Sequence, residues 1–224
     1  MTPLAGGRVI GLAVAILLAA ACSPAKLHLQ QEARSIEPAP GEVFDVTVAL
    51  FIAEKLRNHV EETQLSTRHG ARKTYEFLVG RAAAPLIEAS LGKLFTKVEV
   101  LRSPPTPQSL EQAKAVGVLW IALGGSTIDI HFAPSLVGAE AKSTYDIELL
   151  LYFQSAHGIE VFRRKVTGHG FSSTRTAGDN DAAFLPGIER AVHEAVDRLA
   201  EAVITSARLR DFFQATAAAS ASKD

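Results

Sequence analysis

Residues Thr144–Gln154 read TYDIELLLYFQ and carry the clearest strand pattern in the chain. Every second side chain is large and apolar, and the polar groups fall on the opposite face. Alternation with a period of two is typical of a β-strand with one buried face. The segment Ala156-His157-Gly158 suits a hairpin turn, so we expect a return strand over residues 159–167 that continues loosely to 171.

Further strands are predicted before this hairpin. Val43–Ile52 alternates but carries apolar side chains on both faces, so it should lie inside a sheet. Val116–Leu123 is apolar nearly throughout and is expected to be buried on both faces. Gly124 and Gly125 are expected to form a turn or a bulge, after which residues 126–132 continue as a strand. Lys97–Leu101 is a short additional strand.

Two long helices are predicted on either side of these strands. The first runs from Thr74 to about Phe95, and Pro85 should kink it or divide it in two. The second spans Ala182–Arg208, where apolar residues recur every three or four positions. Residues 53–73 between the first strand and the first helix are expected to be a polar loop. The residues that should pack back onto the sheet after the second helix are Leu209, Phe212 and Phe213.

These elements predict an α+β fold. We expect a two-layer sandwich with a mostly antiparallel sheet of five to six strands and two long helices packed on one face. The predicted domain covers residues 43–213, and residues 214–224 should form a disordered tail. The uncovered sheet face should be mixed, because Asp146, Glu148, Arg163 and Lys165 share it with Leu150 and Tyr152. Leu150 and Tyr152 are therefore candidates for an interaction face.

The N-terminus has the layout of a secretory signal. Arg8 is the only charge before an apolar run over residues 9–21, which ends in three alanines and Cys22. Residues 1–21 are therefore expected to be a signal peptide. Residues 22–42 are polar, contain three prolines, and are expected to form a flexible tether.

Residues Ala19-Ala20-Ala21-Cys22 resemble the lipobox of bacterial lipoproteins, although that motif prefers leucine at the place of Ala19. The resemblance implies that Cys22 is acylated, with palmitate among its chains, and becomes the first residue of the mature protein. In lipoproteins of Gram-negative bacteria, the lack of aspartate at the place of Ser23 favours the outer membrane. The other interpretation is an ordinary signal peptide that leaves Cys22 as a free thiol.

Composition narrows the classes of function. The chain has 224 residues, a formal net charge of −1, 47% hydrophobic residues and 21% charged residues. These are globular values without the excess of basic residues typical of nucleic-acid binding. Because there is one cysteine, no disulfide can form within the chain, and the fold must depend on packing.

We find no motif for catalysis, a metal or a cofactor in the sequence. The seven histidines are scattered and form no H-x-x-x-H or H-E-x-x-H pair. A hydrolase would need His169 and Ser172 to meet a carboxylate in one cleft, and no G-x-S-x-G elbow is present. We therefore expect a protein that is not an enzyme and that needs no cofactor.

Four patterns follow one another along the chain, the first near the N-terminus and the other three within residues 43–213. They are the lipobox, FTKVEV at Phe95–Val100, the hairpin that begins Tyr145-Asp146-Ile147, and A-V-x-x-A-V-x-x-L at Ala191–Leu199. Together they resemble the YajG-type family of small periplasm-facing lipoproteins. The auxiliary lipoproteins of ABC-type lipid transporters have a similar arrangement. Neither family implies a catalytic residue.

The sequence thus predicts a lipoprotein anchored in the outer membrane through Cys22 and facing the periplasm. Its expected role is a non-enzymatic accessory or assembly subunit of a cell-envelope complex, with a protein partner in the envelope and no nucleic acid. The alternative is an auxiliary subunit of an ABC-type lipid transporter that binds acyl chains on its outer sheet face or in a cleft. A cell-wall hydrolase is the third interpretation.

Overall fold

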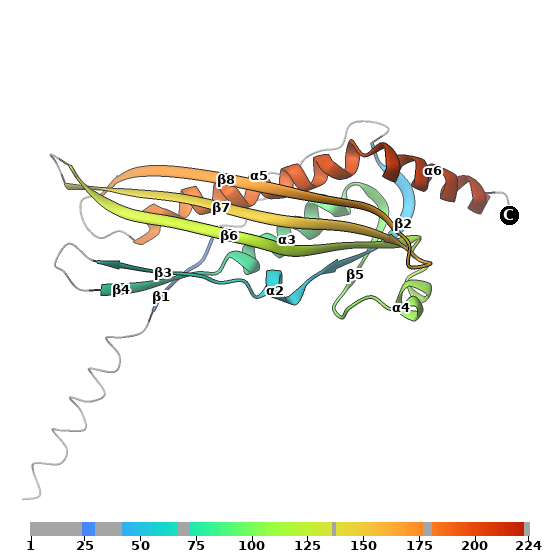
Figure 1. Cartoon of the computed structure of the whole chain (residues 1–224), viewed down its shortest axis with the longest axis horizontal. Coiled ribbons are helices and arrows are strands. Elements are labelled where there is room, and N and C mark those ends of the chain that lie inside the picture. Colours follow the sequence, from blue (N-terminus) through green and yellow to red (C-terminus); the bar gives the residue numbers. More distant parts are fainter. Residues whose placement is uncertain (1–23, 30–41, 67–71, 136–137, 177–180, 222–224) are drawn as a thin grey trace, which may run out of the picture.

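The larger of two sheets contains the predicted hairpin. The computed structural model describes residues 24–29, 42–66, 72–135, 138–176 and 181–221 (Figure 1). The larger sheet has the strand order β5 (Phe95–Leu101), β2 (Phe44–Ile52), β6 (Gly117–Ser135), β7 (Gly138–Ser155) and β8 (Glu160–Thr176). Strand β2 runs parallel to β5 and β6, whereas β6–β7 and β7–β8 are antiparallel. The glycine pair after Leu123 forms a bulge, so β6 continues through it.

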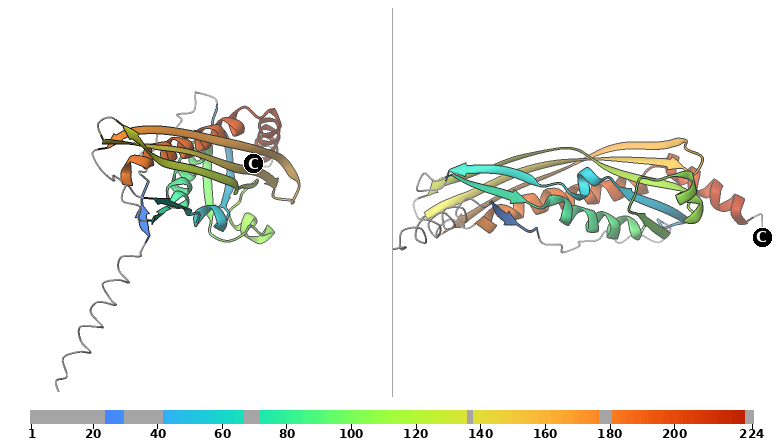
Figure 2. Two further views of the ribbon diagram at one scale, coloured as in Figure 1. Left: turned by 60° about the vertical axis from the view of Figure 1, so that its left-hand side comes forward. Right: turned by 90° about the horizontal axis from the view of Figure 1, so that it is seen from below.

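Two long helices cover one face of this sheet. They are α3 (Val79–Gly92) and α5 (Leu185–Ile204), and Figure 2 shows both on the same side of the long strands. The predicted α+β sandwich is therefore confirmed. Pro85 lies inside the single helix α3 and faces solvent, where the carbonyl group that it leaves unbonded can be hydrated.

The shorter helices are α2 (Glu54–Arg57), α4 (Pro107–Gln112) and the 3₁₀ turn η1 (Asp181–Phe184). No helix in the described ranges is long and apolar enough to cross a membrane.

A smaller sheet corrects the prediction for residues 53–78. Its order is β1 (Ala25–Leu27), β4 (Arg72–Phe77) and β3 (Glu61–Ser66). The predicted loop thus contains a strand, and the helix that was expected from Thr74 begins at Val79 instead. Strand β1 lies within the predicted tether and pairs with β4. Local pattern did not reveal these strands, because β3 has one large apolar side chain, Leu65, and β1 pairs with β4 from a distant part of the chain.

The C-terminal helix also differs from the prediction. The second long helix ends at Ile204, and α6 (Ala207–Ala221) follows where a frayed tail was expected from residue 214. Leu209 and Phe213 are buried, as predicted. The Phe213 ring lies 4.9 Å from that of Phe44 and 5.1 Å from that of Phe153, measured between ring centroids. These contacts fix α6 to the end of the larger sheet.

Glycines allow α5 to lie directly against β8. A Cβ atom added at Gly168 would collide with the Ala191 carbonyl oxygen, and one at Gly170 would collide with the Gly187 carbonyl oxygen. A larger residue in either position must therefore push the helix away from the sheet.

We expect Gly168→Ala to lower the free energy of unfolding by about 2 kcal/mol or more, because the added methyl overpacks the contact between α5 and β8. Urea unfolding measures the change. Gly125→Ala is the matched control, since a Cβ there would have nothing within 4 Å, and it should change stability by less than about 0.5 kcal/mol. Equal stability of the two variants would contradict the described packing.

Candidate functional site

The face of the larger sheet opposite α3 and α5 is only partly covered. At one end, α4 packs on it and encloses a small apolar cluster. The buried members of this cluster are Ala49, Phe51, Leu110, Ala115 and Val118. Beyond α4 the face continues across β6, β7 and β8, where several apolar side chains stay partly exposed.

An aromatic row crosses four strands on this outer face. Phe51, Trp120, Tyr152 and Arg163 are register neighbours on β2, β6, β7 and β8, and we call them the aromatic row. The rings of Phe51 and Trp120 meet edge to face with centroids 4.8 Å apart. The Arg163 guanidinium lies 4.9 Å from the centre of the Tyr152 ring, within cation–π range.

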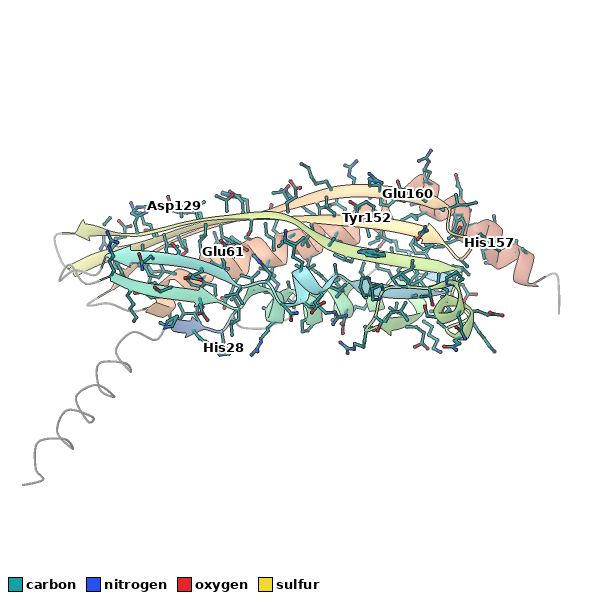
Figure 3. All side chains as sticks on the ribbon, turned by 60° about the horizontal axis from the view of Figure 1, so that its bottom comes forward. His28, Glu61, Asp129, Tyr152, His157 and Glu160 are labelled. Atoms are coloured by element: carbon teal, nitrogen blue, oxygen red, sulfur yellow. The ribbon has the colours of Figure 1, made fainter. Side chains whose placement is uncertain are left out.

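Two members of the row are half-buried rather than enclosed. Trp120 and Tyr152 keep part of their surface exposed, so the expectation that residues 116–123 are buried on both faces fails at Trp120. Tryptophan, tyrosine and arginine are the residue types that contribute most to the affinity of protein interfaces. Figure 3 shows Tyr152 toward one end of the long strands and Glu61, considered below, toward the other.

The sequence-predicted residues Leu150 and Tyr152 both lie on this outer face. Leu150 is half-buried between Ala122 on β6 and Lys165 on β8, its register neighbours. The Lys165 Nζ lies 2.9 Å from a carboxylate oxygen of Glu148, so charges flank the apolar residues. An interaction role for Leu150 and Tyr152 remains a prediction.

His169 and Ser172 do not come together. His169 is exposed on the outer face, and its Nδ1 lies 2.6 Å from Asp146 Oδ1. Ser172 is buried on the opposite face of β8, where its Oγ lies 2.8 Å from Ser143 Oγ. The carboxylate that a hydrolase would need is therefore beside His169, but the hydroxyl group is on the other side of the sheet.

A polar cluster that the sequence analysis missed joins the two sheets. Ser126 on β6 donates a hydrogen bond of 2.6 Å to Glu61 Oε2 on β3. His59 Nε2 lies 3.1 Å from Ser126 Oγ and 3.2 Å from the same Glu61 oxygen. The buried Tyr145 adds its hydroxyl 3.4 Å from His59 Nε2. His59 and Glu61 are two residues apart, but Ser126 and Tyr145 come from distant parts of the chain and belong to no motif with them, so no sequence signal could have joined the four.

The geometry of this cluster differs from that of a catalytic triad. In a triad, one ring nitrogen of the histidine faces the hydroxyl group and the other faces the carboxylate. Here Nε2 of His59 faces both Ser126 and Glu61. The histidine therefore has no separate nitrogen with which to relay a proton between them, and the arrangement is one that links the sheets.

The environment of the cluster favours an ionised Glu61 and a neutral Tyr145. Partial burial opposes ionisation of Glu61, but hydrogen bonds from His59 and Ser126 outweigh it and lower its pKa below the ordinary value. Burial raises the pKa of Tyr145, and the negative charge of Glu61 raises it further. The ionised Glu61 carboxylate thus accepts hydrogen bonds that hold β3 against β6.

The described residues contain no group of three or more His, Cys, Asp or Glu side chains placed to hold a metal ion. Cys22, the predicted lipidation site, lies outside the described residues, as do Ser23 and the predicted signal peptide. Acylation of Cys22 remains a prediction.

We expect Glu61→Gln to remove a part of the stability that depends on pH. Because the folded-state pKa of Glu61 is lowered, its contribution is present above the ordinary value of 4.5 and is lost as the pH falls through the lowered pKa. The substitution should cost about 1 kcal/mol at pH 7 and should flatten the decline of unfolding free energy in acid. Urea unfolding between about pH 7 and pH 3 measures both effects.

Glu62→Gln is the control for this experiment, because Glu62 is exposed on the same strand. It should leave the stability at pH 7 unchanged. A Glu61→Gln protein that matches the parent across the pH range would contradict the linking role of the cluster.

Comparisons with known proteins give weak structural likenesses only. No family model and no curated protein matches the chain. A Helicobacter pylori protein described as a neuraminyllactose-binding hemagglutinin homologue is 12% identical, with a TM-score of 0.47 over 86% of this chain and 99% of that one. A Xanthomonas campestris protein of the family DUF330 is 13% identical, with a TM-score of 0.42 over 80% and 94%. A minor lipoprotein of Acinetobacter baumannii is 5% identical, with a TM-score of 0.35 over 70% and 91%.

Proposed function

We propose that this chain is a lipoprotein of the outer membrane, anchored through acylated Cys22 and facing the periplasm. It acts as a non-enzymatic accessory subunit of an envelope complex and docks a partner protein on the aromatic row. The observation that carries the docking role is the alignment of Phe51, Trp120, Tyr152 and Arg163 across four strands. The lipobox at Ala19–Cys22 supports the anchor.

The row has the composition of an interface centre. Trp120 and Tyr152 offer large surfaces that need little further ordering, because Phe51 holds one ring and Arg163 lies over the other. Charged side chains surround the apolar centre, as Lys165 and Glu148 do beside Leu150. An apolar centre with a polar rim is the usual anatomy of a protein interface.

A protein partner suits the described surface better than an acyl chain does. An acyl chain needs an apolar lining, since each buried methylene contributes about 0.8 kcal/mol. The hollow beside β8, about 520 Å³ in volume, is lined by Arg164, Lys165, Arg198 and Glu201 among others. These charges would have to lose water beside the chain, which makes the lipid-transport alternative the weaker proposal.

We expect Cys22→Ala to move the full-length protein from the membrane fraction to the soluble fraction, because two or three acyl chains supply durable anchoring. Fractionation with an alkaline wash measures this. Ser23→Asp is the matched variant, and it should keep the protein in membranes but move it from the outer to the inner membrane. Membrane retention of the Cys22→Ala protein would contradict the anchor.

We expect the double variant Trp120→Ala and Tyr152→Ala to weaken capture of a stoichiometric partner by at least about thirtyfold, since interface anchors of this kind contribute about 2 kcal/mol or more. Crosslinking in membranes followed by quantitative mass spectrometry measures the loss. Val60→Ala removes an exposed apolar side chain away from the row and should leave capture unchanged. Equal loss in both variants would contradict docking at the row.

A further inference from the structure

Strand β8 is an edge of the larger sheet, and α5 covers part of that edge with side chains. In a strand, the N–H and C=O groups of one residue point to the same side, and this direction alternates along the chain. Three groups on the free edge of β8 bond to α5. Arg190 Nη1 donates to the Phe171 carbonyl at 3.0 Å, the His169 N–H donates to Glu194 Oε2 at 2.6 Å, and Arg198 Nη1 donates to the Thr167 carbonyl at 2.7 Å.

These three contacts form a series with a fixed spacing. The helix residues are four apart and the strand residues are two apart, which correspond to rises of about 6 Å and about 6.6 Å. Every fourth residue of α5 therefore lies beside the next residue of β8 whose backbone groups point to the free edge. The next step pairs Ala202 with Lys165, and a methyl side chain offers neither a donor nor an acceptor. The side-chain cover of the edge thus ends at Thr167.

Beyond this point, no described residue hydrogen-bonds the outward backbone groups of β8 at Arg163 and Lys165. The pairing of β7 with β8 has no register shift between Arg163 and Phe171, so Arg163 and Lys165 point their backbone groups outward as His169 does. The hollow of about 520 Å³ lies along this part of the strand. Its lining includes Phe162, Lys165 and Thr167 on β8 and Arg198, Ala202 and Thr205 beside them.

The charged side chains that line the hollow indicate which kind of strand could pair with this edge. Its lining has three cations, Arg164, Lys165 and Arg198, and one carboxylate, Glu201. Arg198 and Lys165 have ion-pair partners, whereas Arg164 has none among the described residues. Two copies of β8 paired edge to edge would bring the Arg163-Arg164-Lys165 run of each against the other. Like charges across a strand pair are destabilising, so a second copy of this chain is the less favourable occupant.

We propose that residues 163–166 of β8 accept an extended acidic peptide of a partner protein as a sixth strand of the larger sheet. The Lys165 N–H donates to a peptide carbonyl, and the Lys165 carbonyl accepts a peptide N–H. A carboxylate of the peptide lies near Arg164, the cation of the hollow that has no ion-pair partner among the described residues. This site is an edge and not the face that carries the aromatic row, so it goes beyond the proposed function and does not depend on the lipid anchor.

Fluorescence anisotropy of the full-length chain with a labelled peptide tests the proposal at low ionic strength. The probe is a nine-residue peptide that alternates threonine and glutamate. Its two counterparts carry lysine in place of glutamate, or N-methyl groups on the four central amides of the acidic peptide. We expect the acidic probe to bind at least tenfold more tightly than either counterpart, because each counterpart removes one of the two kinds of recognition.

Variants separate the backbone contribution from the charge contribution. Lys165→Pro removes the edge donor, and proline is tolerated in an edge strand, so this variant should fold and lose binding of the probe. Lys165→Gln and Arg164→Gln keep the backbone donor and should each weaken binding by about threefold to fivefold. Arg175→Gln removes an exposed cation of β8 outside the hollow and should change nothing.

Three results would overturn the proposal. The first is a dissociation constant above about 1 mM for the acidic probe with the parent chain. The second is equal affinity for the N-methylated peptide, which would show that charge alone binds it. The third is a dimer in sedimentation that Lys165→Pro dissociates, which would assign the edge to a second copy of this chain.

Discussion

Helix α5 lies so close to β8 that only glycine, which has no Cβ atom, fits at the contact. The burial of the inner sheet face and the cover of the β8 edge both depend on this contact. Gly168 and Gly170 on the strand and Gly187 on the helix each leave no room for a Cβ atom. Because the two backbones are so close, Arg190, Glu194 and Arg198 of α5 can hydrogen-bond the backbone groups at the edge of β8. The same closeness buries Ser143 and Ser172, whose hydroxyl groups bond to each other.

Because α3 and α5 cover the inner face of the sheet so tightly, the side chains that stay accessible for binding lie on the outer face and at the edge. The inner face is closed by α3, α5 and apolar side chains, so large groups that remain accessible on the sheet lie on the outer face. There Trp120 and Tyr152 are held by their register neighbours Phe51 and Arg163. Aromatic surface that is already ordered suits the binding of a partner, because little side-chain entropy is lost when the complex forms.

Sequence patterns predicted the parts of the fold that depend on local alternation. The β7–β8 hairpin, the central strand β2 and the apolar stripe of α5 all carry their own period. Strand β3 has no such period, since Leu65 is its one large apolar residue, and Tyr75 and Phe77 of β4 also continue the apolar stripe of the helix that follows. The polar cluster was equally out of reach, since His59 and Ser126 become neighbours only when the two sheets meet. The aromatic row could be predicted only in part: alternation placed Tyr152 and Arg163 on the outer face, but the strand register is needed to add Phe51 and Trp120.

The lengths of the elements explain why a second sheet is needed at all. Strand β6 has 19 residues and extends about 60 Å, whereas α3 has 14 residues and is about 21 Å long. A helix of that length covers about a third of β6, and the inner face beyond it carries Ile128 and Ile130, which water would otherwise reach. The small sheet supplies the missing cover with Tyr75 and Phe77, both buried in the main core.

Where one sheet packs on another, the polar groups at their contact must also be hydrogen-bonded. The hydrogen bonds from Ser126 and His59 to an ionised Glu61 do this. The cluster is therefore a structural consequence of strands that are longer than the helices available to cover them.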